Sequence, residues 1–129
     1  MLNRDQLKTV TMAVTAADAT IGSNVPVNMR RFIYRTKFIN TLNGDNLLTL
    51  GKRENGAGAT TVVDYIQAAV QYQMEVDPEE LHDDSAPLYV VEGPAQNPLI
   101  TPVGASVVRA QCSALGTGFL TLWYIDAPA

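Results

Sequence analysis

Residues 118–126 read G-F-L-T-L-W-Y-I-D and contain no proline and no charge before the last residue. Side chains alternate between the two faces of a β-strand. The odd positions therefore share one face and the even positions the other: Phe119, Thr121, Trp123 and Ile125 against Leu120, Leu122 and Tyr124. Both faces are largely apolar, whereas one face of each sheet in a two-layer sandwich normally meets water. We expect the outer face to be covered, either by the proline-containing segment 93–104 or by another subunit.

The same two-residue period recurs along the chain. Turn-forming residues predict loops over 18–26, 51–59 and 93–104. Asn43-Gly44 is a strong turn signal and predicts a hairpin over 29–50, and the sequence A-L-G-T-G over 114–118 predicts a second hairpin. The apolar alternation predicts strands at 8–16, 29–42, 47–50, 66–76, 88–92, 105–113 and 118–125.

The segment 61–70 is ambiguous between helix and strand. Thr61 and Asp64 have the spacing of a helix capping box, while the alternation from residue 66 onward indicates a strand. Seven or eight strands without a long helix predict an all-β, mainly antiparallel fold. We expect a β-sandwich or jelly roll with at most one or two short helical turns. The chain of 129 residues fits one domain, with residues 1–6 either ordered or forming an N-terminal arm.

Composition bears on the partners of the chain. Charged residues make up 17% of the sequence, below the usual quarter or so, which suggests that copies of the chain cover part of its surface. The net charge of −4 argues against binding nucleic acid over the whole surface. Cys112 is the only cysteine, which excludes an intrachain disulfide, and we expect it to be a small buried apolar residue.

The N-terminal residues lack the apolar core of a signal peptide, and no apolar run is long enough to span a membrane. We therefore expect synthesis in the cytosol and no membrane partner.

Residues 30–37 contain four of the nine basic residues. Strict alternation places Arg31, Arg35 and Lys37 on one face, with Phe32 and Tyr34 on the other. A nucleic-acid platform needs aromatic rings among the charges, so nucleic acid is not the expected partner. This face is either solvated or a patch for an acidic partner.

Residues 77–84, D-P-E-E-L-H-D-D, hold five carboxylates and the only histidine, His82. Asp77 and Pro78 fit the start of a helical turn. The spacing is not that of an EF-hand and includes no glycine, and a zinc site needs more ligands than His82. We interpret the stretch as a solvated or partner-facing turn, with a weak divalent-cation site and a catalytic carboxylate pair as lesser alternatives. No catalytic, cofactor-binding or metal-binding residue is assigned.

The chain is small, cysteine-poor, low in charge and β-rich, with long polar loops. In these general features it resembles small structural proteins of viruses, such as the head-decoration or cement proteins of tailed phages and jelly-roll coat subunits. The resemblance implies a trimer or other symmetric oligomer that binds a capsid lattice, without catalysis or cofactor. It also implies a location in the virion after synthesis in the host cytoplasm.

We therefore expect a self-associating structural protein, not an enzyme. The expected contact residues are Arg31, Arg35, Lys37, Glu79, Glu80, Asp83, Asp84, Phe119, Trp123 and Tyr124. The alternative is a β-sandwich module that binds a glycan or another small ligand through exposed aromatic rings, with Trp123, Tyr34, Tyr65, Tyr72, Tyr89 and Tyr124 as candidates. A jelly-roll metal enzyme of the cupin kind needs several histidines, and this chain has one.

Overall fold

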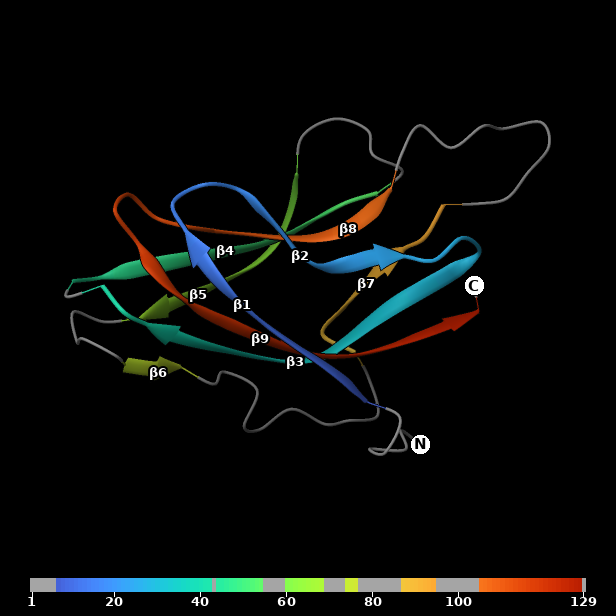
Figure 1. The fold of residues 1–129 in the computed structure, drawn as a ribbon, viewed down its shortest axis with the longest axis horizontal. Coiled ribbons are helices and arrows are strands. Elements are labelled where there is room, and N and C mark those ends of the chain that lie inside the picture. Colours follow the sequence, from blue (N-terminus) through green and yellow to red (C-terminus); the bar gives the residue numbers. More distant parts are fainter. Residues whose placement is uncertain are drawn as a thin grey trace.

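The computed structural model describes residues 7–42, 44–54, 60–68, 74–76, 87–94 and 105–128. These residues form two antiparallel sheets that face each other, with no helix among them (Figure 1). The strands are β1 (Lys8–Thr15), β2 (Ala19–Val25), β3 (Met29–Asn40), β4 (Asn46–Arg53), β5 (Thr61–Ala68), β6 (Met74–Val76), β7 (Tyr89–Glu92), β8 (Ser106–Cys112) and β9 (Thr117–Pro128).

The strand pairs are nested. β1 pairs with β9, β2 with β8, β3 with β6 and β7, and β4 with β5, all antiparallel. β9 also pairs with β3, and β8 also pairs with β4. One sheet therefore has the order β1-β9-β3-β6, with β7 also paired to β3, and the other has the order β2-β8-β4-β5. Nested pairing across two sheets is the pattern of a jelly roll. The prediction of an all-β antiparallel sandwich is confirmed.

Two loop predictions were wrong in part, and one open choice is decided. Residues 19–25 form strand β2 instead of a loop, because Gly22 adopts a positive φ of 79° and an irregularity between Ile21 and Val25 absorbs the turn-forming residues. β4 continues to Arg53, into the loop predicted over 51–59. Residues 61–65, left open between helix and strand, belong to β5, because cross-strand pairing overrides the capping-box signal. Residues 1–6, 43, 55–59, 69–73 and 95–104, which carry other predicted features, lie outside the described residues.

Both predicted hairpins were also wrong, because β3 and β4, and likewise β8 and β9, lie in opposite sheets. The two crossovers meet in a buried amide network. The Asn40 Oδ1 accepts hydrogen bonds from the Leu42 N–H at 2.9 Å and from the Asn46 amide at 3.0 Å. The Asn46 amide also donates to the Thr117 carbonyl at 3.1 Å. The side-chain amides thus satisfy backbone N–H and C=O groups at both connections, which a two-stranded hairpin would otherwise have to pair.

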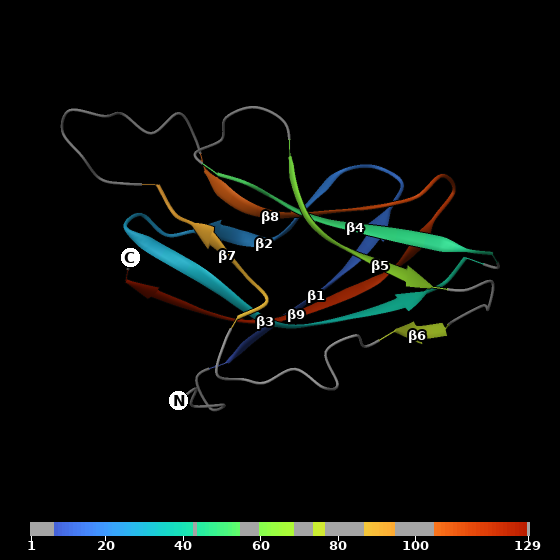
Figure 2. The ribbon, with the colours of Figure 1, turned by 180° about the vertical axis from the view of Figure 1, so that it is seen from behind.

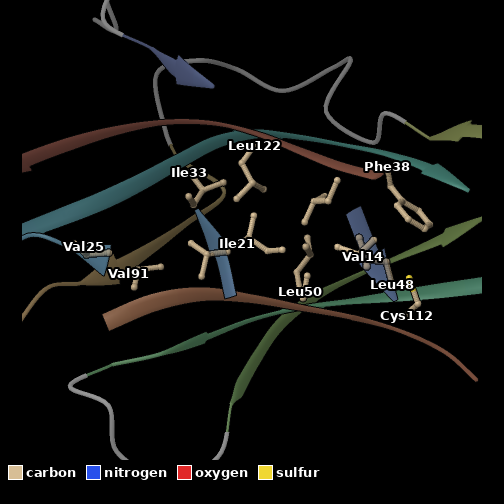
Figure 3. Close-up of a cluster of buried hydrophobic side chains, with 13 residues drawn as sticks. Val14, Ile21, Val25, Ile33, Phe38, Leu48, Leu50, Val91, Cys112 and Leu122 are labelled. Atoms are coloured by element: carbon tan, nitrogen blue, oxygen red, sulfur yellow. The ribbon is translucent and has the colours of Figure 1, made fainter. Parts of the chain in front are cut away.

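The core lies between the two sheets (Figure 3). The largest fully buried side chain is Phe38 of β3, which lies toward one end of the layer, while Val25 and Val91 lie toward the other. Leu120 and Leu122, the even positions of β9, are buried, which confirms the division of that strand into two faces. Cys112 is buried as predicted, and burial raises the pKa of its thiol above the ordinary value, opposed by a hydrogen bond with Asn46.

Candidate subunit-contact face

A β-bulge in β3 decides which side chains share a face. Ile33 pairs with Tyr124 and Arg35 pairs with the next residue of β9, Trp123, so Tyr34 is an extra residue. A bulge of this kind shifts the alternation by one residue. Arg31 and Ile33 point into the core before the bulge, whereas Arg35 and Lys37 point outward after it. The prediction that Arg31 shares a face with Arg35 and Lys37 was therefore wrong.

The outward side chains of β1, β9 and β3 form one continuous surface, which we name the Trp123 face. Opposed residues in an antiparallel pair point to the same side of the sheet, and β9 lies between β1 and β3 (Figures 1 and 2). By register, the face contains Thr9, Thr11 and Ala13 of β1, Phe119, Thr121, Trp123 and Ile125 of β9, and Phe32, Arg35, Lys37 and Ile39 of β3.

Apolar side chains dominate this face although it is a sheet exterior. Phe119 is 46% exposed, and Trp123 and Ile125 are half-buried. The guanidinium of Arg35 lies over the Trp123 ring, 4.7 Å from its centroid. The Thr11 and Thr121 hydroxyls are 2.8 Å apart and hydrogen-bond across β1 and β9. The bulge thus places cations among aromatic rings, contrary to the separation expected from strict alternation.

Arg31 does not belong to this face. Its side chain is buried and makes a bidentate ion pair with Asp126, with the Nε–Oδ1 distance at 2.8 Å and the Nη2–Oδ2 distance at 2.9 Å. Nη1 donates to the Ser23 carbonyl of β2 at 2.6 Å. Arg31 therefore joins the two sheets, and it cannot serve as the surface contact that we expected.

Tyr124 is also placed differently from the prediction. It lies on the inward side of β9, packed against the core, and the Arg31 guanidinium is 4.4 Å from its ring centroid. Phe119, Trp123, Arg35 and Lys37 remain as described contact candidates. The acidic candidates Glu79, Glu80, Asp83 and Asp84 lie outside the described residues, and so does His82.

Other polar clusters within the described ranges are internally paired. Arg109 binds Asp18 at 3.2 Å and the Thr20 hydroxyl at 2.6 Å on the second sheet. No group of three or more His, Cys, Asp or Glu residues in the described part could hold a metal ion. Across the same ranges the structure contains no helix of the length and apolarity needed to cross a membrane.

The sequence carried no signal for the Trp123 face as a whole. The segment around the extra residue, F-I-Y-R, contains no glycine or proline that would indicate a bulge. Only the two apolar faces of residues 118–126 pointed to part of it.

No protein-family model, curated protein or solved structure matches this chain.

Proposed function

We propose that this chain is a non-enzymatic structural protein that associates with copies of itself through the Trp123 face, as a virion decoration, cement or capsid component. The observation that carries the proposal is the apolar row of Phe119, Trp123 and Ile125 on a sheet exterior, where Phe119 is exposed and Trp123 and Ile125 are half-buried. Apolar clusters on an outer surface typically mark protein contacts.

The make-up of the face supports this proposal. Interfaces combine an apolar, aromatic-rich centre with a polar rim, and arginine is enriched in them while lysine is depleted. Here the β9 row is flanked by threonines of β1 on one side and by Arg35 and Lys37 of β3 on the other. The low charged fraction of the chain, 17%, agrees with a surface that is partly covered in the assembly.

The viral part of the proposal rests on the general resemblance together with the strand order. The jelly roll occurs in viral capsid domains, and also in lectins and cupins, so the order by itself does not select one function. A cupin-type metal site needs several histidines and the sequence has one.

The glycan-binding alternative needs an aromatic ring with a free face for stacking. One face of the Trp123 ring is occupied by the Arg35 guanidinium, and Tyr124 points inward beneath Arg31. These contacts favour self-association over sugar stacking on those two rings.

The test is the solution mass, measured by light scattering at micromolar concentration. We expect a discrete oligomer, and we expect Phe119→Lys to lower its mass by burying a charge in the contact. Val62→Lys is the matched control, because Val62 is 45% exposed on β5 of the other sheet. A wild-type monomer, or equal masses for the two variants and the wild type, would contradict the proposal.

Electron microscopy of the concentrated protein tests the viral role. Closed shells indicate a coat subunit, and discrete small oligomers indicate a decoration protein. Disordered aggregates alone would count against both.

A further inference from the structure

The two sheets have four edges, and two of them, at β6 and β7 and at β2, are closed. A free edge exposes unpaired N–H and C=O groups, and proteins usually block it with charges, bulges or short strands. At β7, the Lys52 ammonium donates to the Val90 carbonyl at 3.0 Å, and the Glu92 N–H donates to Glu54 at 2.6 Å. β6, on the same side of β3, has three residues.

The edge of β2 is closed in a similar way. Its pairing is irregular between Ile21 and Val25, and Arg31 binds the Ser23 carbonyl at 2.6 Å. The Gly22 N–H donates to the Met12 sulfur at 3.2 Å.

β1 differs from these edges. It pairs with β9 without a register shift over Lys8–Thr15, and six of its eight residues are exposed. In the described part of the chain, its backbone makes no hydrogen bond to any segment other than β9. It contains no proline and no bulge, and its one charge, Lys8, is at the end. A straight, exposed strand of this kind is a template for an added strand.

We infer that β1 pairs antiparallel with β1 of a second copy, joining two five-stranded sheets into one. This inference rests on the proposed function and names the contact that begins the assembly. The occupant is a second copy because the strand complements itself. Antiparallel pairing about Met12 sets Thr9 beside Thr15, Thr11 beside Ala13 and Val10 beside Val14, and it places the two Lys8 side chains at opposite ends.

The geometry limits the register. Directly opposed residues must point to the same side of the joined sheet. The twofold axis must therefore lie midway between two copies of the same residue, so that this residue is opposed by its own copy. An axis at Met12 pairs Val10 with Val14 and Thr11 with Ala13, and an axis at Thr11 pairs that residue with itself. Ala13 lies opposite Phe119, so the odd residues of β1 belong to the Trp123 face. In either register these residues point to the same side in both copies, and the two Trp123 faces become continuous.

The edge of β5 provides the contrast. It has the same length as β1 and carries exposed Val62 and Tyr65. Its pairing with β4 has a register shift, and Asp64 lies near its middle. Antiparallel pairing of two β5 strands about their middle would set the Asp64 positions of the two copies beside each other, and like charges at such positions oppose pairing.

The experiment uses a nitroxide spin label on the full chain. Thr11→Cys carries the label on β1, and Val62→Cys carries it on β5 as the matched control. Native Cys112 is buried with a raised thiol pKa, so it should not label, and wild-type protein treated with the reagent checks this. In either register the two Thr11 Cβ atoms lie within roughly 8 Å. We expect dipolar broadening for the Thr11 label and none for the Val62 label.

Amide hydrogen exchange is the second measurement. The β1 amides that point away from β9 should be protected at concentrations where the oligomer forms and should exchange on dilution. An oligomer without broadening at Thr11 and with unprotected β1 amides would overturn the inference and leave the proposed function standing. A strict monomer by light scattering would instead contradict the proposed function itself.

Discussion

Arg31 and Arg35 are the same residue type on the same strand, four positions apart, and they have opposite environments. Arg31 is 2% exposed and bound by Asp126 and Ser23 between the sheets. Arg35 lies on the sheet exterior over the Trp123 ring. The extra residue Tyr34 between them is the cause, because it reverses the alternation of β3.

The energetic role of a polar residue in β3 is therefore set by the side of the sheet on which it lies and not by its residue type. An inward polar group has lost its water and depends on partners within the protein. The bidentate carboxylate and the Ser23 carbonyl meet that need for Arg31. An outward group keeps access to water, so losing a partner there costs little.

The largest expected effect follows from removing Arg31. Arg31→Ala leaves the Asp126 carboxylate buried without its cation, and such a loss costs about 3–5 kcal/mol of unfolding free energy. Arg35→Ala removes a cation–π contact on the sheet exterior between two half-buried residues and should cost less than about 1 kcal/mol. Urea unfolding of the two variants measures the difference.

Arg31→Lys offers a variant that keeps the charge but not the bidentate geometry, and it should fall between the wild type and Arg31→Ala. If Arg31→Ala and Arg35→Ala unfold at the same urea concentration, the assignment of opposite faces is wrong.

The next effect concerns Asn40, another inward polar residue of β3. Asn40→Ala leaves the Leu42 N–H, the Gly44 carbonyl and the Asn46 amide without their shared partner. We expect a loss of about 2–3 kcal/mol, since each unsatisfied buried group costs roughly 1–3 kcal/mol and the site can admit some water. Thermal and urea unfolding measure this loss.

Thr41→Ala is the control at the same corner. It removes the exposed hydroxyl hydrogen bond to Thr117, 2.8 Å long, and should cost well under about 1 kcal/mol. Equal losses for Asn40→Ala and Thr41→Ala would show that burial of the amide network contributes nothing.

The smallest effect has the opposite sign. Thr36 points inward and is 1% exposed, and its hydroxyl has no hydrogen-bond partner among the described residues. Thr36→Val keeps the shape and removes the unsatisfied group, so it should stabilise the fold by up to about 1 kcal/mol. Thr121→Val makes the same change on the outer face, where the hydroxyl bonds to Thr11, and should be neutral or slightly destabilising. A loss of stability in Thr36→Val would contradict the inward placement.

Local pattern was sufficient for much of the fold. The strand positions of β1, β3, β7, β8 and β9 follow from the two-residue period, since alternation reflects a sheet with one buried face. The same period correctly separated Leu120 and Leu122 from Phe119 and Trp123. The candidate site was predicted only in part, through the apolar odd positions of β9.

The two-residue period was therefore enough to predict an all-β sandwich and the face of β9 that enters its core, because alternation is a local property of a strand. The remaining features depend on contacts between distant segments. The bulge at Tyr34 depends on pairing with Trp123 and Tyr124 of β9, far away in sequence. The connections from β3 to β4 and from β8 to β9, which cross between the sheets, depend on the buried hydrogen bond between Asn46 and Asn40 and on the bond from Asn46 to the Thr117 carbonyl. These contacts join distant segments, so no local pattern could place Arg31 inside and Arg35 outside.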